Sequence, residues 1–83
     1  MEYEEIIKRI DFEYREAATQ GQVPRFFVVD EGTYKTLNRG LHDTFTPKKP
    51  YRPAKYIVLN FPNTQGVPVY KIPVKEGVMI TVM

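Results

Sequence analysis

Two prolines in one strand-like run limit the sheets that this chain can form. The run VPVYKIPV covers residues 67–74 and carries Pro68 and Pro73, five residues apart. Proline has no backbone N–H and cannot donate to a sheet ladder. Successive amides of a strand point to opposite edges, so prolines an odd number of residues apart lack donors on opposite edges. Neither neighbouring strand can therefore pair along the whole run, and we expect a ladder in its middle, over residues 69–72.

Three further segments have the composition of strands. Residues 25–30, RFFVVD, are continuously apolar through their middle, which predicts an inner strand with both faces covered. Residues 55–60, KYIVLN, and residues 78–82, VMITV, are rich in aliphatic and β-branched side chains. The turn-forming stretches FPNTQG and KEG separate the last three strands. This order predicts that the last three strands form a meander.

The first residues have the periodicity of an amphipathic helix. Apolar side chains recur three and four residues apart and share one face; they are Tyr3, Ile6, Ile7, Ile10, Tyr14, Ala17 and Ala18. Gly21 is placed to end this helix. Phe12 lies about 180° from the apolar stripe, so it is either covered by a loop of the same chain or contacts a partner.

A second, shorter helix is expected after the first strand. Asp30 or Thr33 can cap its start, and Gly40 is a stop signal. Residues 41–54, LHDTFTPKKPYRPA, show no helical or strand period and contain three prolines, so they predict a long loop. Together these patterns predict a single α+β domain over residues 1–83. Its long N-terminal helix packs on a mainly antiparallel sheet of about four strands, with a short second helix.

The chain has few chemically active side chains. It contains no cysteine and no serine, which excludes cysteine and serine nucleophiles as well as disulfides. His42 is the only histidine, and its neighbour Asp43 provides neither metal-ligand spacing nor a complete proton-transfer arrangement. The five glycines stand singly, so there is no phosphate-binding glycine loop. We therefore expect a protein that is not an enzyme and that binds no metal and no cofactor.

The densest motif is PKKPYRP, residues 47–53. Its prolines recur every third residue, as in a polyproline II helix, and an arginine follows in the order P-x-x-P-x-R of ligands for aromatic-grooved domains. The same stretch also suits a stiff, solvated loop. A third interpretation is a contact with single-stranded nucleic acid, in which cations and a ring meet a phosphate backbone. The residues of that contact are Lys48, Lys49, Tyr51, Arg52 and Lys55.

Charge is unevenly distributed along the chain. Residues 2–16 hold three more acidic than basic side chains, whereas the whole chain has a net charge of +2. A small cysteine-free domain has little core, and its acidic helix complements its basic loop, so we expect self-association, most simply as a symmetric dimer. The contact is expected on the helix around Phe12 or along the sheet edge. The edge residues are Val78, Ile80 and Val82.

No segment has the pattern of a signal peptide or a membrane span. The N-terminus, MEYEEIIKRI, is acidic where a signal peptide is basic and then continuously apolar. No apolar run approaches the roughly 20 residues that cross a bilayer. We expect a cytoplasmic protein without a membrane partner.

The stretches FFVVDEGTYKTLNR and YIVLNFPNTQGVPVYKIPVKEGVMITV resemble the C-terminal part of HK97-type tailed-phage coat proteins. In that family a small helix precedes a G-x-P-V strand and a P-x-G turn. Residues 66–69 match the strand, residues 73–77 stand near the turn, and the resemblance runs from Phe26 onward. Such coat proteins also have an extended arm, a long loop and a spine helix, for which this chain has no room. The resemblance implies a shared supersecondary unit in a small phage or prophage protein, located in the host cytoplasm or the virion, and not a complete shell subunit. With the missing catalytic residues and the surfaces suited to contact, we expect a small, non-enzymatic structural or protein-interaction protein.

Overall fold

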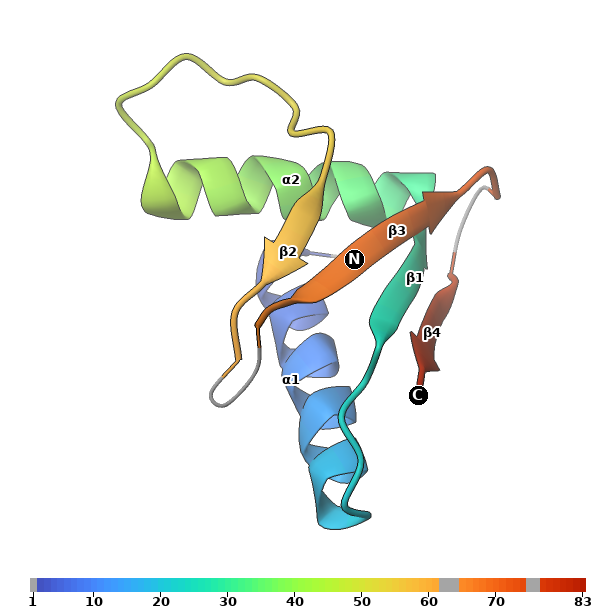
Figure 1. The fold of residues 1–83 in the computed structure, drawn as a ribbon. Coiled ribbons are helices and arrows are strands. Elements are labelled where there is room, and N and C mark those ends of the chain that lie inside the picture. Colours follow the sequence, from blue (N-terminus) through green and yellow to red (C-terminus); the bar gives the residue numbers. More distant parts are fainter. Residues whose placement is uncertain (1, 62–64, 75–76) are drawn as a thin grey trace.

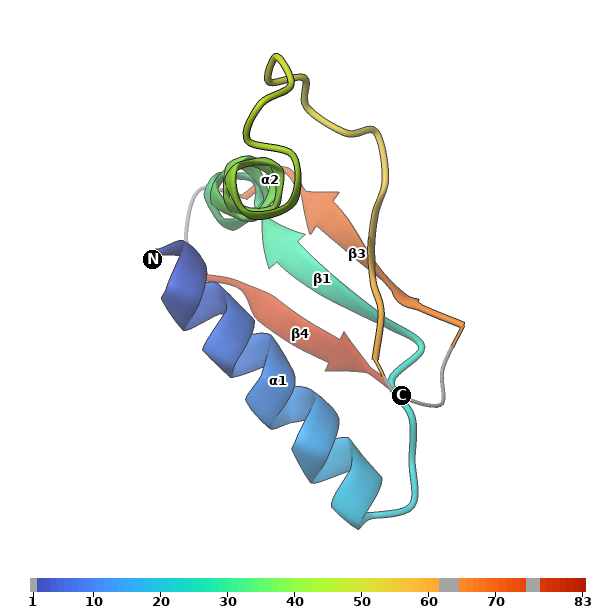
Figure 2. The ribbon, with the colours of Figure 1, turned by 90° about the vertical axis from the view of Figure 1, so that its left-hand side faces the viewer.

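The protein has two layers, with two helices on one face of a four-stranded sheet (Figure 1). The computed structural model describes residues 2–61, 65–74 and 77–83. The helices are α1 (Tyr3–Thr19) and α2 (Glu31–Phe45), and the strands are β1 (Phe26–Asp30), β2 (Ile57–Leu59), β3 (Val67–Ile72) and β4 (Met79–Val82). Figure 2 shows both helices on the same side of the strands. The predicted α+β class is confirmed.

Helix α1 follows the apolar stripe of the sequence. Ile6, Ile10 and Ala17 are buried, and Ile6 and Ile10 belong to the core that the sheet and α2 also form. The helix ends where predicted, because Gly21 adopts a φ of 72° that side-chain-bearing residues rarely accept. The N–H groups of Gly21 and Gln22 donate to the carbonyls of Ala18 and Ala17 and satisfy the last turn.

Helix α2 is longer than the sequence predicted. Asp30 caps it, as expected, but the helix continues through Gly40 to Phe45 instead of stopping at the glycine. Gly40 does not adopt the positive φ of a helix-ending glycine, and its lack of a side chain serves a close helix crossing instead: a methyl group added there would overlap the ring of Tyr3 on α1. Gly40 therefore provides room for a neighbouring helix, and the loop begins only after Phe45.

The sheet has the order β2-β3-β1-β4, so the predicted meander is wrong. Strand β1 lies between β3 and β4, parallel to the first and antiparallel to the second. As the most continuously apolar strand, β1 takes an inner position, where the free energy gained by burial is largest. Its inner position was predicted, whereas the crossover that separates β3 from β4 was not.

Neither neighbouring strand pairs along the whole 67–74 run, as predicted, but the ladder is not confined to residues 69–72 because β2 pairs with residues 67–69. Strand β3 pairs with β1 only over residues 69–72, and with β2 only over residues 67–69. Pro68 precedes the first pair with β1, and Pro73 follows the last residue of β3. Each neighbouring strand therefore pairs with a part of the run in which its ladder needs no backbone hydrogen bond from a proline.

The core lies between the sheet and the helices. Its fully buried side chains include Phe27 and Val29 of β1, Val67 of β3 and Leu37 of α2. The expectation that both faces of β1 are covered is wrong for the described chain, because both helices pack on the same face (Figure 2). The alternate residues Phe26 and Val28 are only half-buried.

Candidate interaction surfaces

The outer face of the sheet, which points away from α1 and α2, is apolar across all four strands. Side chains alternate between the two faces of a strand, and the helix-facing set is fixed by buried Phe27, Val69 and Ile57, which share a register. The residues of the outer face are therefore Phe26, Val28, Val58, Pro68, Tyr70, Ile72, Ile80 and Val82, together with Asp30 at the end of β1, which is buried. None of the others is charged, although a solvated face of a sheet normally alternates to polar side chains.

The exposure of this face is substantial. Val58, Tyr70 and Ile80 are 52%, 48% and 50% exposed. The rings of Phe26 and Tyr70 meet edge to face, with centroids 5.2 Å apart, and hold one another at the centre of the sheet. An uncharged patch on the order of 500 Å² is thus open to solvent, a size at which the largest patch of a monomer is often functional.

The predicted contact residues fall on two different surfaces. Ile80 and Val82 belong to the outer face, and Val78 is half-buried beside it, just before β4. Phe12 is 56% exposed on α1, which lies in the helix layer. The structure therefore groups the strand residues together and separates them from Phe12.

The basic loop, residues 46–56, is anchored to α2 by side chains. Asn38 donates from Nδ2 to the carbonyl of Ala54 at 3.4 Å and accepts from the N–H of Ala54 at 3.2 Å. His42 Nε2 lies 2.6 Å from the carbonyl oxygen of Lys49. The ring of Tyr51 lies under the Arg39 guanidinium, 4.5 Å from its centroid, and meets the His42 ring edge to face. Tyr51 is thus engaged within the chain rather than presented for stacking.

The contacts of His42 with Asp43 and Lys49 serve a structural role. The second ring nitrogen of His42, Nδ1, lies 3.0 Å from Asp43 Oδ1, so both nitrogens have partners. The hydrogen bond from His42 lowers the pKa of the Asp43 carboxyl, and the nearby Arg39 lowers it further. In residues 2–61, 65–74 and 77–83, no further acid, base or nucleophile is hydrogen-bonded to the His42 or Asp43 side chain. Among the described residues, no group of three or more potential ligands could hold a metal ion.

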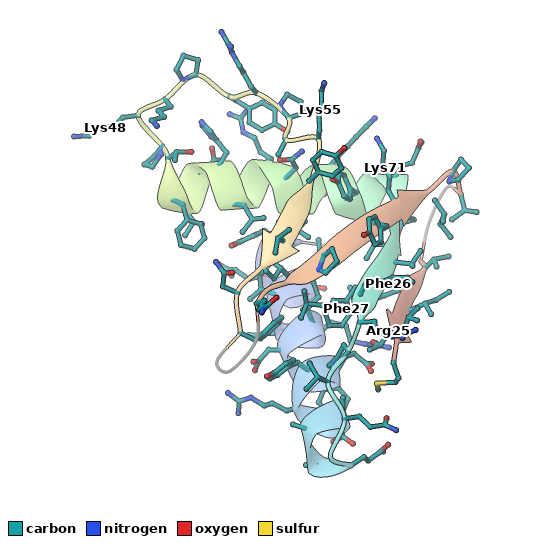
Figure 3. All side chains as sticks on the ribbon, in the orientation of Figure 1. Arg25, Phe26, Phe27, Lys48, Lys55 and Lys71 are labelled. Atoms are coloured by element: carbon teal, nitrogen blue, oxygen red, sulfur yellow. The ribbon has the colours of Figure 1, made fainter. Side chains whose placement is uncertain are left out.

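The residues predicted to contact nucleic acid lie on one loop, but the ring of Tyr51 is oriented differently from the exposed cations. Lys48, Lys49, Arg52 and Lys55 are exposed, and none of them forms an ion pair within the described part of the chain. Lys48 and Lys55 extend away from the body of the molecule (Figure 3). The loop therefore presents uncompensated positive charge, with Tyr51 turned inward toward α2.

A groove lies between the β2 segment on one side and α1 and α2 on the other. It has a volume of about 890 Å³ and follows six consecutive residues, Tyr56–Phe61. Its helical side is formed by Tyr3 and Ile7 of α1 and by Leu41 and Phe45 of α2. No local sequence signal predicted this groove, because three elements that are distant in the chain build it.

Asp30 links three elements at one end of β1. Its side chain accepts hydrogen bonds from the N–H of Thr33 at 3.1 Å, from Thr33 Oγ1 at 2.6 Å and from the N–H of Val78 at 3.4 Å. Burial acts to raise the pKa of Asp30, but the hydrogen bonds from Thr33 and Val78 outweigh it and lower the pKa. The carboxylate thereby ties the start of α2 to the chain entering β4.

Comparison with known proteins gives no further assignment. No protein-family model matches the chain, and no curated protein or solved structure gives a significant match. Within the described residues, neither helix has the length and apolarity that a membrane crossing requires.

Proposed function

We propose that the protein is a small, non-enzymatic structural protein that associates with a second copy of itself through the outer face of the sheet. The observation that carries this proposal is the uninterrupted apolar character of that face. In water, an uncovered sheet face of this composition is unfavourable by about 25 cal/mol for each Å² of apolar surface that a partner could cover. A partner surface is therefore expected.

The composition of the face favours a second copy as the partner. An uncharged surface is complementary to itself, because a twofold axis brings no like charges together. Two such patches would bury roughly 1,000 Å² in total, which is near the lower limit for a specific interface. Two sheets packed in this way lie about 10 Å apart, as in a β-sandwich.

Sedimentation equilibrium over a wide concentration range tests the proposal. We expect the unmodified protein to form a dimer, and Tyr70→Glu and Ile80→Glu to remain monomeric because each places a charge in the contact. Phe12→Glu is the matched control, since Phe12 is about equally exposed but lies in the other layer. A protein that stays monomeric at high micromolar concentration would refute the proposal, as would a Phe12 variant that is the only one to dissociate.

A phage or prophage origin remains part of the proposal. Its support is the sequence resemblance to coat proteins, and it places the protein in the host cytoplasm or the virion. Detection of the protein in purified virions by mass spectrometry, after induction of the host strain, is the corresponding test. If the protein is absent from virions and its gene does not lie near packaging or coat genes, the proposed phage origin is wrong.

Single-stranded nucleic-acid binding is the second candidate function. The uncompensated charge of Lys48, Lys49, Arg52 and Lys55 favours it. Titration of a labelled oligonucleotide at two salt concentrations distinguishes this candidate, because affinity from phosphate contacts falls steeply as salt rises. We expect the double variant Lys48→Ala/Lys49→Ala to lose any such binding without a change in dimerisation. No binding at low salt would exclude the second candidate.

A further inference from the structure

The groove beside β2 has the features of a site for an extended peptide. Strand β2 is at one edge of the sheet and pairs only with β3. An edge strand presents backbone donors and acceptors that can pair with an added strand. Figure 2 looks onto this edge, with α1 and α2 on one side of β2 and the basic loop above it.

Pro68 determines which backbone groups of β2 face the groove. In the antiparallel pairing of β2 with β3, Val58 stands opposite Pro68, between the pairs Ile57–Val69 and Leu59–Val67. Opposed pairs alternate between those that exchange two hydrogen bonds and those that exchange none. Because proline has no N–H, the Val58–Pro68 pair is of the second kind. The N–H and C=O of Val58 therefore point away from β3, into the groove.

The groove also offers apolar contacts next to this backbone edge. Ile7, Leu41 and Leu59 are only partly buried, pack against the core and line the groove. An added strand turns alternate side chains toward this wall. Five residues of such a strand span roughly 17 Å, about the extent of the six residues of the β2 segment that line the groove.

The charge at one end of the groove indicates which charge a partner should carry there. Arg52 lines the groove beside Tyr56, and Lys48, Lys49 and Lys55 belong to the same loop. The polar side chains Asn38 and His42 also line the groove, but they already hold the loop in place. The available charge at this end is thus positive.

We infer that the groove binds an extended segment of another protein by strand addition to the outer edge of β2. The segment carries apolar residues at alternate positions and acidic residues at the end next to the basic loop. Backbone pairing at Val58 gives the segment its register, the wall of α1 and α2 accepts its apolar side chains, and the loop attracts its acidic end. This site adjoins the outer face of the sheet at Val58, but its helical wall and the basic loop are not part of that face.

A synthetic peptide is the probe for this inference. It carries fluorescein, two aspartates and then alternating valine and threonine; a matched peptide has lysines in place of the aspartates. We expect saturable binding of the aspartate peptide, several-fold tighter than that of the lysine peptide at low salt, with the difference shrinking as salt screens the loop. Absence of saturable binding, or tighter binding of the lysine peptide, would overturn the inference.

One substitution tests the backbone pairing directly. Val58→Pro removes the N–H that faces the groove but no donor of the β2–β3 ladder, because proline is tolerated where its missing donor faces the free edge. Val58→Ala is the matched control, since it shortens the same side chain and keeps the N–H. We expect the proline variant to bind the aspartate peptide roughly tenfold more weakly than the alanine variant. Equal binding by the two variants would contradict strand addition.

Amide hydrogen exchange gives a second test that does not depend on any variant. On saturation with the aspartate peptide, the Val58 amide should become protected from exchange, whereas the Ile57 and Leu59 amides, already paired with β3, should change little. An unprotected Val58 amide in the saturated complex would refute the inference. The Tyr70→Glu protein should bind the peptide as the unmodified protein does, so loss of dimerisation and loss of peptide binding are separable.

Discussion

Replacement of Asp30 should reveal how strongly one carboxylate holds three elements together. Asp30→Ala removes the cap of α2, which costs about 1 kcal/mol in typical helices. It also removes the acceptors of Thr33 Oγ1 and of the Val78 N–H. Each donor left buried without a partner adds about 1 kcal/mol or more. We expect a total loss of about 3 kcal/mol in the free energy of unfolding, which lowers Tm by roughly 15 °C for a domain of this size.

The charge of Asp30 can be separated from its hydrogen bonds by pH. The folded state lowers the pKa of Asp30, so its carboxylate stabilises the fold above the unfolded pKa of about 4. That contribution disappears as pH falls through the folded pKa, when both states become protonated. Asp30→Asn should therefore be less stable than the unmodified protein from pH 7 to pH 5, by about 1–2 kcal/mol, and the gap should close in stronger acid.

Urea unfolding followed by far-ultraviolet circular dichroism is the assay. Glu31→Gln is the matched control, because it removes an equal charge one residue later in the first turn of α2, from an exposed position. That control should cost only about 0.5 kcal/mol, through the helix dipole. If Asp30→Ala costs less than about 1 kcal/mol, or if Asp30→Asn behaves as Glu31→Gln does at every pH, the assigned role of Asp30 is wrong.

Two further substitutions test other contacts. Gly40→Ala usually stabilises a helix by about 1 kcal/mol, but here we expect a loss of about 2 kcal/mol because the methyl group meets Tyr3. Thermal unfolding of the single variants and of Gly40→Ala/Tyr3→Ala checks this, and fully additive losses would exclude the proposed contact. Tyr51→Ala should release the basic loop from Arg39 and His42 and speed trypsin cleavage after Lys48 several-fold, with little effect on Tm. Tyr56→Ala, at an exposed ring on the same loop, is its control, and equal cleavage rates in the two variants would contradict the anchoring role.

Local patterns in the sequence predicted the elements that depend on local interactions. The period of α1, its end at Gly21 and the cap at Asp30 could be read directly, because each depends on residues within one or two turns. The prolines predicted a ladder over residues 69–72, although not that β1 would be the strand that forms it. In each case, neighbouring residues carry the whole physical cause.

Features that depend on distant residues could not be predicted in the same way. Gly40 has the sequence signature of a helix end, and only the position of Tyr3, on another helix, shows why a glycine stands inside the helix instead. The place of β1 between β3 and β4 likewise depends on a crossover that no short pattern encodes. For the candidate sites, the sequence indicated Ile80 and Val82, but it gave no sign of the groove beside β2. That groove exists only once α1, α2 and β2 are in place.

The inner position of β1 has a consequence for biosynthesis. Both neighbours of β1 come from later parts of the chain. Because Phe26 pairs with Val82, the pairing of β1 with β4 cannot be completed until residue 82 has left the ribosome. At about 5–20 residues per second, synthesis of this chain leaves the most apolar strand without a partner for several seconds. Pairing over so long a sequence separation is also slow to form. The yield of the protein in the cell should therefore depend on translation speed and temperature as well as on the stability of the finished fold.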